Sequence, residues 1–335
     1  MSLYSGIDLH SNNHVLTIID EKDVRIFEKR LPNDLNTTLA SLKPYKRRLK
    51  GIAVESTFNW YWLVDGLQAE GYPMVLANPA AMKQYDGLKY ADDRHDAYWL
   101  AHMLRLGILP TGYIYPRERR AVRDLLRVRQ QLVRHKSRLL VAIQNQIWRR
   151  NGYKVASSQI TRSPFPIPLD DEFEQAAAQS ELAVLRKLQA EIKRLERKAT
   201  DELSLEREYE VLKTTTGIGP ILALTIMLET GDIGRFDKVG QYASYCRCVQ
   251  SVRTSNDKTK GQGNAKSGNK YLSWAFSEAA HFAVRYEPLA RRFYDRKYQK
   301  TNGIVAIRSV AHKLARAVYY MLKHQEPFDA ARAFG

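Results

Sequence analysis

Three aspartates, Asp92, Asp93 and Asp96, lie within five positions of a chain whose formal net charge is +17. Spacings of three and four residues place Asp96 on one helical face with both of the others. Like charges this close repel one another, so the pattern predicts a cation between them. Capping and the helix dipole also favour aspartates at a helix start, and the segment alone is more typical of a cap than of a set of metal ligands.

Two further acidic residues lie in apolar segments that have the character of strands. Asp8 lies within YSGIDLH, where an ionised side chain is costly unless a metal or a hydrogen-bond donor meets it, although a hydrogen-bonded turn would also explain it. Glu55 follows the apolar run LKGIAV, so its carboxylate emerges at a strand end. Carboxylates converging from these segments form an oxygen site suited to Mg²⁺. Two such ions about 4 Å apart stabilise the attacking and leaving oxygens of a phosphodiester.

Strands alternating with helices must position these acids. Periodicity and turn residues predict two strands joined by a polar turn over 4–20, a third strand over 25–32, and further strands over 48–57 and 73–79. The same criteria predict helices over 60–71 and about 92–106. This alternation predicts an α/β domain over residues 1–115.

Residues 116–207 are predicted to form a basic helical connector. Residues 117–150 form one predicted helix with an apolar stripe and 11 Lys and Arg residues, and a second predicted helix has the 3-4 alternation of a coiled coil around 185–199. The two helices could pair as an antiparallel hairpin or assemble between subunits. A solvated spacer is the plain interpretation, but the lopsided charge favours contacts with phosphates. The connector residues assigned to nucleic-acid binding are Arg119, Arg120, Arg123, Arg127, Arg134, Lys136 and Arg138.

Residues 208–335 are predicted to be compact and mostly helical. Gly217-Ile218-Gly219-Pro220 opens an apolar helix, and such a turn presents backbone N–H groups to a phosphate, as in helix-hairpin-helix modules, or is a simple helix start. The polar, glycine-rich segment 251–272 is predicted to be a flexible loop that closes onto a helix from about Lys270. The residues assigned to nucleic-acid binding in this region are Gly217, Gly219, Arg253, Lys258, Lys260, Lys266 and Lys270.

Composition points to a polyanionic partner. The 335 residues, enough for two domains and a helical spacer, include 53 Lys and Arg against 36 Asp and Glu. This balance favours nucleic acid first and an anionic membrane second. No apolar run reaches the roughly 20 residues of a membrane span, and the first residues do not resemble a secretory signal. Two cysteines, Cys246 and Cys248, make neither a disulfide framework nor a four-ligand zinc site. We therefore expect the cytoplasm and no membrane partner.

The motifs GIDLH, AVEST and K-x-x-D-D-R-x-D-A resemble those of the DEDD-motif insertion-sequence transposases, family one hundred and ten in the insertion-sequence numbering. The resemblance continues through TTTGIGPILALTIMLETGDIGRF, ASYCRCVQSVRTS and GNAKSGNKYLSWAFSEAA, and it covers nearly the whole chain in order. It implies an α/β RNase H-like, RuvC-like N-terminal domain over 1–115 and a helical coiled-coil connector over 116–207. It also implies a mostly α-helical transposase domain over 208–335, with a helix-hairpin-helix-like segment and a nucleophile loop.

The resemblance implies an acidic tetrad of Asp8, Glu55, Asp93 and Asp96 that binds Mg²⁺, with two ions per site. The last two acids of the family are three residues apart, which selects Asp93 over Asp92. The family also implies a serine nucleophile, and the matching position is Ser255. The residues around Ser255 depart from the family pattern: Arg247-Cys248-Val249-Gln250 replaces glycine-leucine-x-proline, and Asn256 replaces the glycine that follows the serine. Ser251 is therefore the alternative nucleophile.

The activity that the resemblance implies is serine attack on a DNA phosphodiester. This attack leaves a covalent phosphoserine link and a free 3′-hydroxyl, and strand exchange and religation follow. A structured guide RNA would pair with donor and target DNA, and the protein would act as a dimer that pairs into a tetramer. Two alternatives remain open: a RuvC-like Holliday-junction resolvase or structure-selective nuclease that uses water, and a non-catalytic nucleic-acid-binding regulator.

Overall fold

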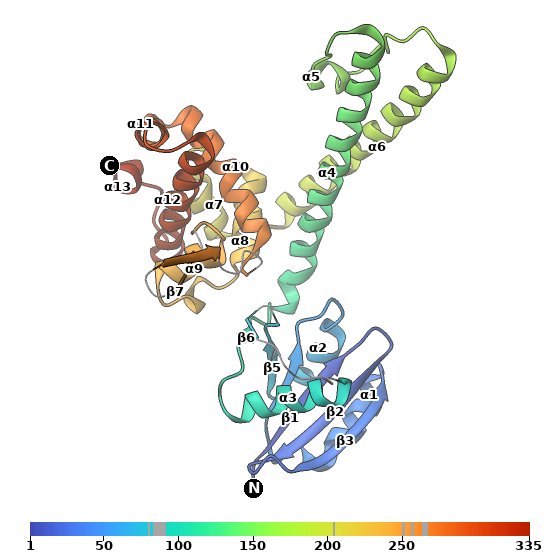
Figure 1. Cartoon of the computed structure of the whole chain (residues 1–335), viewed down its shortest axis with the longest axis vertical. Coiled ribbons are helices and arrows are strands. Elements are labelled where there is room, and N and C mark those ends of the chain that lie inside the picture. Colours follow the sequence, from blue (N-terminus) through green and yellow to red (C-terminus); the bar gives the residue numbers. More distant parts are fainter. Residues whose placement is uncertain (80, 83–91, 204, 250–251, 256–257, 263–266) are drawn as a thin grey trace. The chain divides into compact units, whose positions relative to one another are not determined.

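A computed structural model of the chain describes residues 1–335 except 80, 83–91, 204, 250–251, 256–257 and 263–266, and it describes 252–255 and 258–262 as backbone. The described residues form two compact units, Met1–Arg117 and Glu118–Gly335 (Figure 1). By contacts, the connector helices group with the C-terminal helices. The mixed α/β N-terminal part and the helical remainder agree with the predicted classes of structure. No helix of the described residues is long and apolar enough to cross a membrane.

The first unit is built on a six-stranded sheet with the order β3-β2-β1-β4-β5-β6. β1, β2 and β3 pair antiparallel, β4 and β5 run parallel to β1, and β6 pairs antiparallel with β5. The four predicted strand segments are confirmed. The strands are β1 (Leu3–Leu9), β2 (Asn13–Asp20), β3 (Arg25–Pro32), β4 (Leu49–Glu55), β5 (Met74–Ala77) and β6 (Thr111–Gly112).

Helices cover both faces of the sheet, which explains the nearly continuous apolar runs of β1, β2 and β4. One face packs on α1 (Leu35–Leu42), the short 3₁₀ helix η1 (Lys43–Tyr45) and α2 (Tyr61–Ala69). The other face packs on α3 (Asp93–Arg105), whose Leu100 and Met103 contact Ala53 and Ala77. Because alternate strand residues face opposite sides, Asp8 and Glu55 lie on the face that α3 covers.

Gly6 allows α3 to lie directly on β1. A Cβ atom at this position would stand 1.9 Å from the backbone oxygen of Ala97 and 2.7 Å from the nitrogen of Ala101, so only glycine fits. Ala97 and Ala101 are fully buried and add to the close approach. The packing of small residues therefore brings the first turn of α3, with its aspartates, to the end of β1.

In the second unit, α4 (Arg117–Asn151) and α6 (Glu172–Leu203) pair as a helical hairpin, and the short α5 (Ser157–Ile160) lies in the connection (Figure 1). Leu140, Ile143 and Ile147 of α4 pack in one apolar cluster with Leu182 and Leu185 of α6. Within the chain, the two helices thus pair as the hairpin that the sequence allowed.

The remaining helices enclose the largest core of the described residues. Segment 251–272, predicted as a flexible loop, contains a two-stranded hairpin, and the helix predicted from about Lys270 is confirmed as α10. The β-branched Val252, Thr254 and Thr259 favour these strands. The elements are α7 (Arg207–Lys213), α8 (Pro220–Thr230), η2 (Ile233–Arg235), α9 (Val239–Tyr245), β7 (Val252–Ser255), β8 (Lys258–Gln262), α10 (Lys270–Tyr286), α11 (Pro288–Tyr298), α12 (Gly303–His324) and α13 (Ala330–Phe334).

Candidate active site

Asp8 and Glu55 lie next to one another at the carboxyl ends of adjacent parallel strands. β1 pairs with β4 up to Ile7 and Val54, and the two acids are the next residues along each strand. Asp8 is buried and Glu55 is half-buried. The parallel register therefore brings together two carboxylates that are 47 positions apart in the sequence.

The start of α3 separates the roles of Asp92 and Asp93. Asp92 is the N-cap residue, and its Oδ1 accepts a hydrogen bond of 2.8 Å from the backbone N–H of His95. Asp93 lies in the first turn, where its Oδ1 is 3.4 Å from Nε2 of His10 and its Oδ2 accepts a hydrogen bond of 2.5 Å from Arg30. Asp92 thus caps the helix, and Asp93 faces the strand ends.

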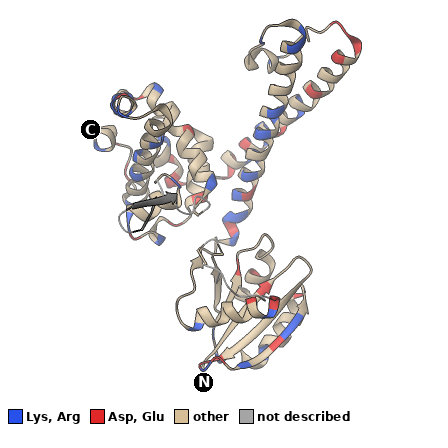
Figure 2. Cartoon of the chain, in the orientation of Figure 1, with Lys and Arg blue, Asp and Glu red and all other residues tan. Residues whose placement is uncertain are grey.

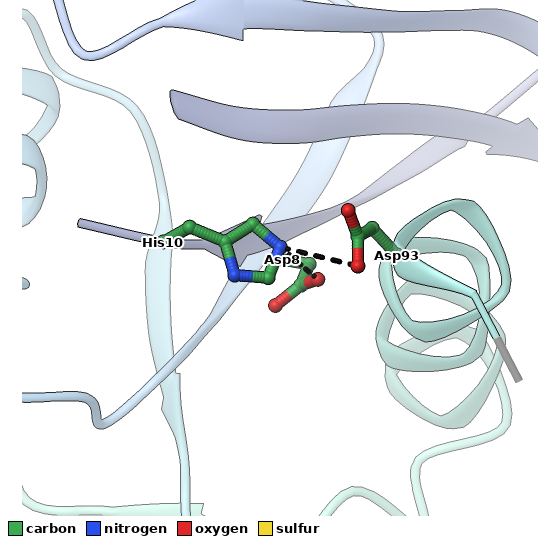
Figure 3. A group of neighbouring side chains, drawn as sticks. All are labelled: Asp8, His10 and Asp93. Atoms are coloured by element: carbon green, nitrogen blue, oxygen red, sulfur yellow. Dashed lines mark ion pairs between the residues drawn. The ribbon is translucent and has the colours of Figure 1, made fainter. Parts of the chain in front are cut away.

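His10 joins this cluster, although the sequence had not indicated it as a ligand (Figure 3). One side-chain atom each from Asp8, His10 and Asp93 lie within 4.8 Å of one another, close enough to hold a metal ion. Asp8 Oδ2 and His10 Nε2 are 3.0 Å apart but not aligned for a hydrogen bond, so both atoms are buried without a hydrogen-bond partner among the described residues. A buried carboxylate oxygen in this state fits a divalent cation.

The pKa values show that four carboxylates interact. Burial raises the pKa of Asp8 from 3.8 to about 6; His10 opposes the rise, and Asp96, Asp93 and Glu55 add to it. Burial also raises the pKa of Glu55, with Asp96 as the next cause. Burial is likewise the main reason that the pKa of Asp96 is raised. The hydrogen bond from Arg30 lowers the pKa of Asp93.

These four acids are the predicted tetrad, and the structure brings them to one edge of the sheet. Burial, with a smaller contribution from the neighbouring carboxylates, raises the pKa values of Asp8, Glu55 and Asp96, and a bound cation would relieve both effects. Asp8, His10 and Asp93 can therefore hold a divalent metal between the end of β1 and the start of α3, whereas Glu55 and Asp96 are outside this group of ligand atoms.

Ser255 is the last residue of β7 and pairs with Lys258, the first residue of β8, at the turn of the hairpin. Two hydrogen bonds join the residues before this hairpin to the residues after it. Before the hairpin, Arg247 Nε donates 3.0 Å to the backbone oxygen of Gly268. After it, the backbone N–H of Asn269 donates 2.6 Å to the backbone oxygen of Tyr245. The alternative nucleophile, Ser251, lies outside the described residues.

A buried polar network extends from the hairpin segment to the connector. Asn269 caps α10 through its Oδ1, and its Nδ2 donates 2.7 Å to Glu229 Oε2. Glu229 of α8 is only 4% exposed and forms two hydrogen bonds with Arg127 of α4, at 2.6 and 2.8 Å. The guanidinium of Arg127 also lies over the ring of Tyr271, 4.7 Å from its centre. Networks of this kind fix geometry, so the contacts hold α4, α8 and the start of α10 in place relative to one another.

Several connector arginines do not lie on an exposed face, which corrects the predicted basic surface. Arg120 and Arg123 are buried, at 4% and 8% exposure, and Arg127 pairs with Glu229. Arg119 forms an ion pair with Glu206. Arg119 and Arg127 therefore join α4 to Glu206 and Glu229 of its own unit. Basic residues lie along α4 (Figure 2). Among them, Arg134 and Arg138 are exposed and Lys136 is half-exposed.

The predicted glycine turn is also explained by packing. Gly217 has φ +102°, and a Cβ there would meet the backbone oxygen of Ala279 at 2.5 Å, so α10 requires this glycine. Gly219 caps α8 and has open space around it. The other predicted basic positions differ in location: Lys270 is exposed at the start of α10, Arg253, Lys258 and Lys260 lie on β7 and β8, and Lys266 lies outside the described residues.

Comparison with known proteins gives a consistent result. Residues 5–148 match the family model of DEDD transposases of the IS110 type, described as "Transposase". Residues 209–295 match a second model, "Transposase IS116/IS110/IS902 family". The chain is similar to "Putative transposase y4qE" of Sinorhizobium fredii, with 25% identity over 78% of this chain and 66% of that protein. It is 22% identical to "Probable family 20 transposase" of Pseudomonas aeruginosa (96% and 93% covered) and to "Transposase for insertion sequence element IS1111A" of Coxiella burnetii (96% and 90%).

Proposed function

Because the chain belongs to the DEDD transposases of the IS110 family, we propose that it is a DNA recombinase in which a serine and an acidic metal site cut and rejoin DNA. The observation that carries this proposal is the group of Asp8, His10 and Asp93 around a buried Asp8 oxygen that has no hydrogen-bond partner among the described residues, with Glu55 and Asp96 near enough to raise the pKa of Asp8. The sheet order, with three antiparallel strands followed by parallel β4 and β5, supports the RNase H-like and RuvC-like assignment that the family implies.

The metal is Mg²⁺, with two ions per site in the working enzyme. The tetrad oxygens are the hard ligands that Mg²⁺ prefers, and Asp8, Asp93 and His10 already lie within reach of a common ion. When bound, Mg²⁺ supplies charge stabilisation at the phosphate oxygens. Arg30 holds one oxygen of Asp93 and leaves the other directed to the site.

The protein's own nucleophile is the hydroxyl of Ser255. Its oxygen attacks the phosphorus atom and forms an O–P bond, while the bond between phosphorus and the 3′-oxygen breaks. The serine proton leaves to a base and the 3′-oxygen takes up a proton, so a phosphoserine link and a 3′-hydroxyl result. Rejoining reverses these steps with a 3′-hydroxyl from another strand. The attachment of the hairpin segment at Arg247 and Asn269 supports this role, because a nucleophile must be held in position.

The partners in this proposal are donor DNA, target DNA and a structured guide RNA. The guide RNA is inferred only from membership of the family. Phosphate contacts come from the basic positions that the structure leaves accessible, including Arg134, Arg138 and Lys270, and from the basic residues of the β7–β8 hairpin. The protein acts as a homo-oligomer, a dimer or tetramer, that assembles through its coiled-coil connector. A prokaryotic cytoplasm is its expected location.

A covalent trapping assay tests the proposed function. The purified chain is incubated with Mg²⁺, RNA transcribed from the flanks of its gene, and end-labelled donor and target DNA, and is then denatured. We expect labelled DNA attached to the protein, and no attached label when EDTA replaces Mg²⁺. Cut DNA without an adduct would show that water is the nucleophile, as in a resolvase. Binding without cleavage would identify a regulator.

Mg²⁺ is expected to raise the unfolding temperature of the chain by roughly 5 °C at about pH 7.5 and by much less at about pH 5. The reason is the pKa of Asp8, which is raised from 3.8 to about 6. The stability that protonated Asp8 contributes to the metal-free chain is lost as the pH rises through this interval, and a cation compensates for the loss. Below it, protons compete with the metal. Differential scanning fluorimetry measures the shift, and an equal shift at both pH values would contradict the assignment.

A further inference from the structure

Phe58 is the most exposed aromatic side chain among the described residues, at 86%. It lies three residues after Glu55, in the turn between β4 and α2. The ring adds nothing to the core of the first unit, whereas the nearby Trp60 is 7% exposed and packs in that core. A turn position favours small polar residues, and the phenyl ring of Phe58 is left accessible to a ligand.

The turn that carries Phe58 is held rigidly against the acidic site. Asn59 Nδ2 donates 2.8 Å to the backbone oxygen of His10, and Thr57 Oγ1 donates 3.0 Å to Asn59 Oδ1. The backbone N–H of Thr57 also donates 2.8 Å to the backbone oxygen of Glu55. The turn is therefore attached both to β4 and to the residue that follows the end of β1. The backbone that carries Phe58 therefore loses little conformational freedom when the ring binds a ligand, which favours recognition.

We propose that Phe58 stacks on a nucleobase beside the phosphate that the acidic site cuts and holds that base out of its normal stack. This inference rests on the proposed function, which brings a DNA strand to Asp8 and Glu55. Every nucleobase has a flat π face, so stacking on an aromatic ring adds binding energy without selecting a sequence. Duplex DNA hides the bases from an enzyme, and unstacking one of them gives the metal site access to the backbone.

Photo-crosslinking tests the stacking without requiring cleavage. Duplexes that carry 5-iododeoxyuridine, fully paired or with one mismatch, are irradiated with the full-length chain in Ca²⁺, and the attached peptide is sequenced. We expect a crosslink at Phe58, with a yield about tenfold lower in Phe58→Leu. Phe173→Leu is the matched control, because Phe173 is 76% exposed but lies on α6. A yield unchanged in Phe58→Leu, or crosslinks only at other residues, would overturn the proposal whether or not the chain cuts DNA.

Cleavage kinetics provide the second measurement. Phe58→Leu is expected to cut fully paired donor DNA about tenfold more slowly at saturating DNA, and a mismatch beside the cleavage site is expected to restore the rate. A variant that had lost its fold would cut both substrates slowly, so recovery on the mismatch isolates the stacking role. Equal loss on both substrates would overturn it, and so would a change of oligomer size in Phe58→Leu, which would show that the ring contacts another protein copy.

Discussion

Replacing Asp8 with asparagine is expected to stop Mg²⁺-dependent DNA cleavage, with a loss of roughly a thousandfold or more because a catalytic metal contributes several kcal/mol. Asparagine keeps the size of the side chain and removes the negative charge that interacts with the other acids of the tetrad and would bind the metal. The fold should tolerate the change. Burial raises the pKa of Asp8 to about 6, so the ionised carboxylate destabilises the metal-free chain at neutral pH and a neutral amide does not. Single-turnover cleavage of labelled DNA measures the loss, and circular dichroism checks the fold.

Asp92→Asn is the matched control for this experiment. Asn and Asp cap helices equally well, so the bond to the backbone N–H of His95 persists and cleavage should continue near the parent rate. Asp93→Asn should instead behave like Asp8→Asn. If Asp92→Asn lost activity and Asp93→Asn kept it, the tetrad would include the wrong aspartate. If Asp8→Asn remained active without metal, the site would not be a metal site.

The sequence predicted the elements of the first unit well because its signals there are local. Apolar runs of strand length and a capped helix start produced β1, β2, β4 and α3 with nearly their observed bounds. The face on which Asp8 and Glu55 meet depends on the parallel pairing of β1 with β4 and on the fit of α3 against Gly6. That pairing is a long-range contact, so the sequence indicated which acids are involved but not how their side chains come close to one another.

Two features of the structure were not predicted from the sequence. His10 reaches Asp8 because residues two apart on an extended chain point the same way. The period-2 spacing of these two residues is therefore the sequence signal for His10 as a ligand. The arginines of α4 show the opposite error. Helical periodicity placed Arg120 and Arg123 on a polar face, but the fold buries them and pairs Arg127 with Glu229. Charge counts cannot distinguish a phosphate-binding guanidinium from one that pairs inside the protein.

Replacing Ser255 with alanine is expected to eliminate the covalent protein–DNA adduct and to lower strand transfer by roughly four orders of magnitude or more, since the lost oxygen is the atom that would bond to phosphorus. Ser255 is the last residue of β7, at the turn of the hairpin. Removing one hydroxyl leaves the network of Asn269, Glu229 and Arg127 intact, so DNA binding should not change. Denaturing gels measure the adduct, and fluorescence anisotropy measures binding.

Ser251→Ala separates the two serine candidates in the same assay. If Ser255 is the nucleophile, Ser251→Ala still forms the adduct and peptide mapping locates the label within residues 252–255. If the adduct disappears in Ser251→Ala and persists in Ser255→Ala, the register of the nucleophile loop is shifted by four residues. If Ser255→Ala and Ser251→Ala both cut DNA at the parent rate, water is the nucleophile. The acidic site would then act alone, as in a structure-selective nuclease, and the attached hairpin would serve to bind DNA.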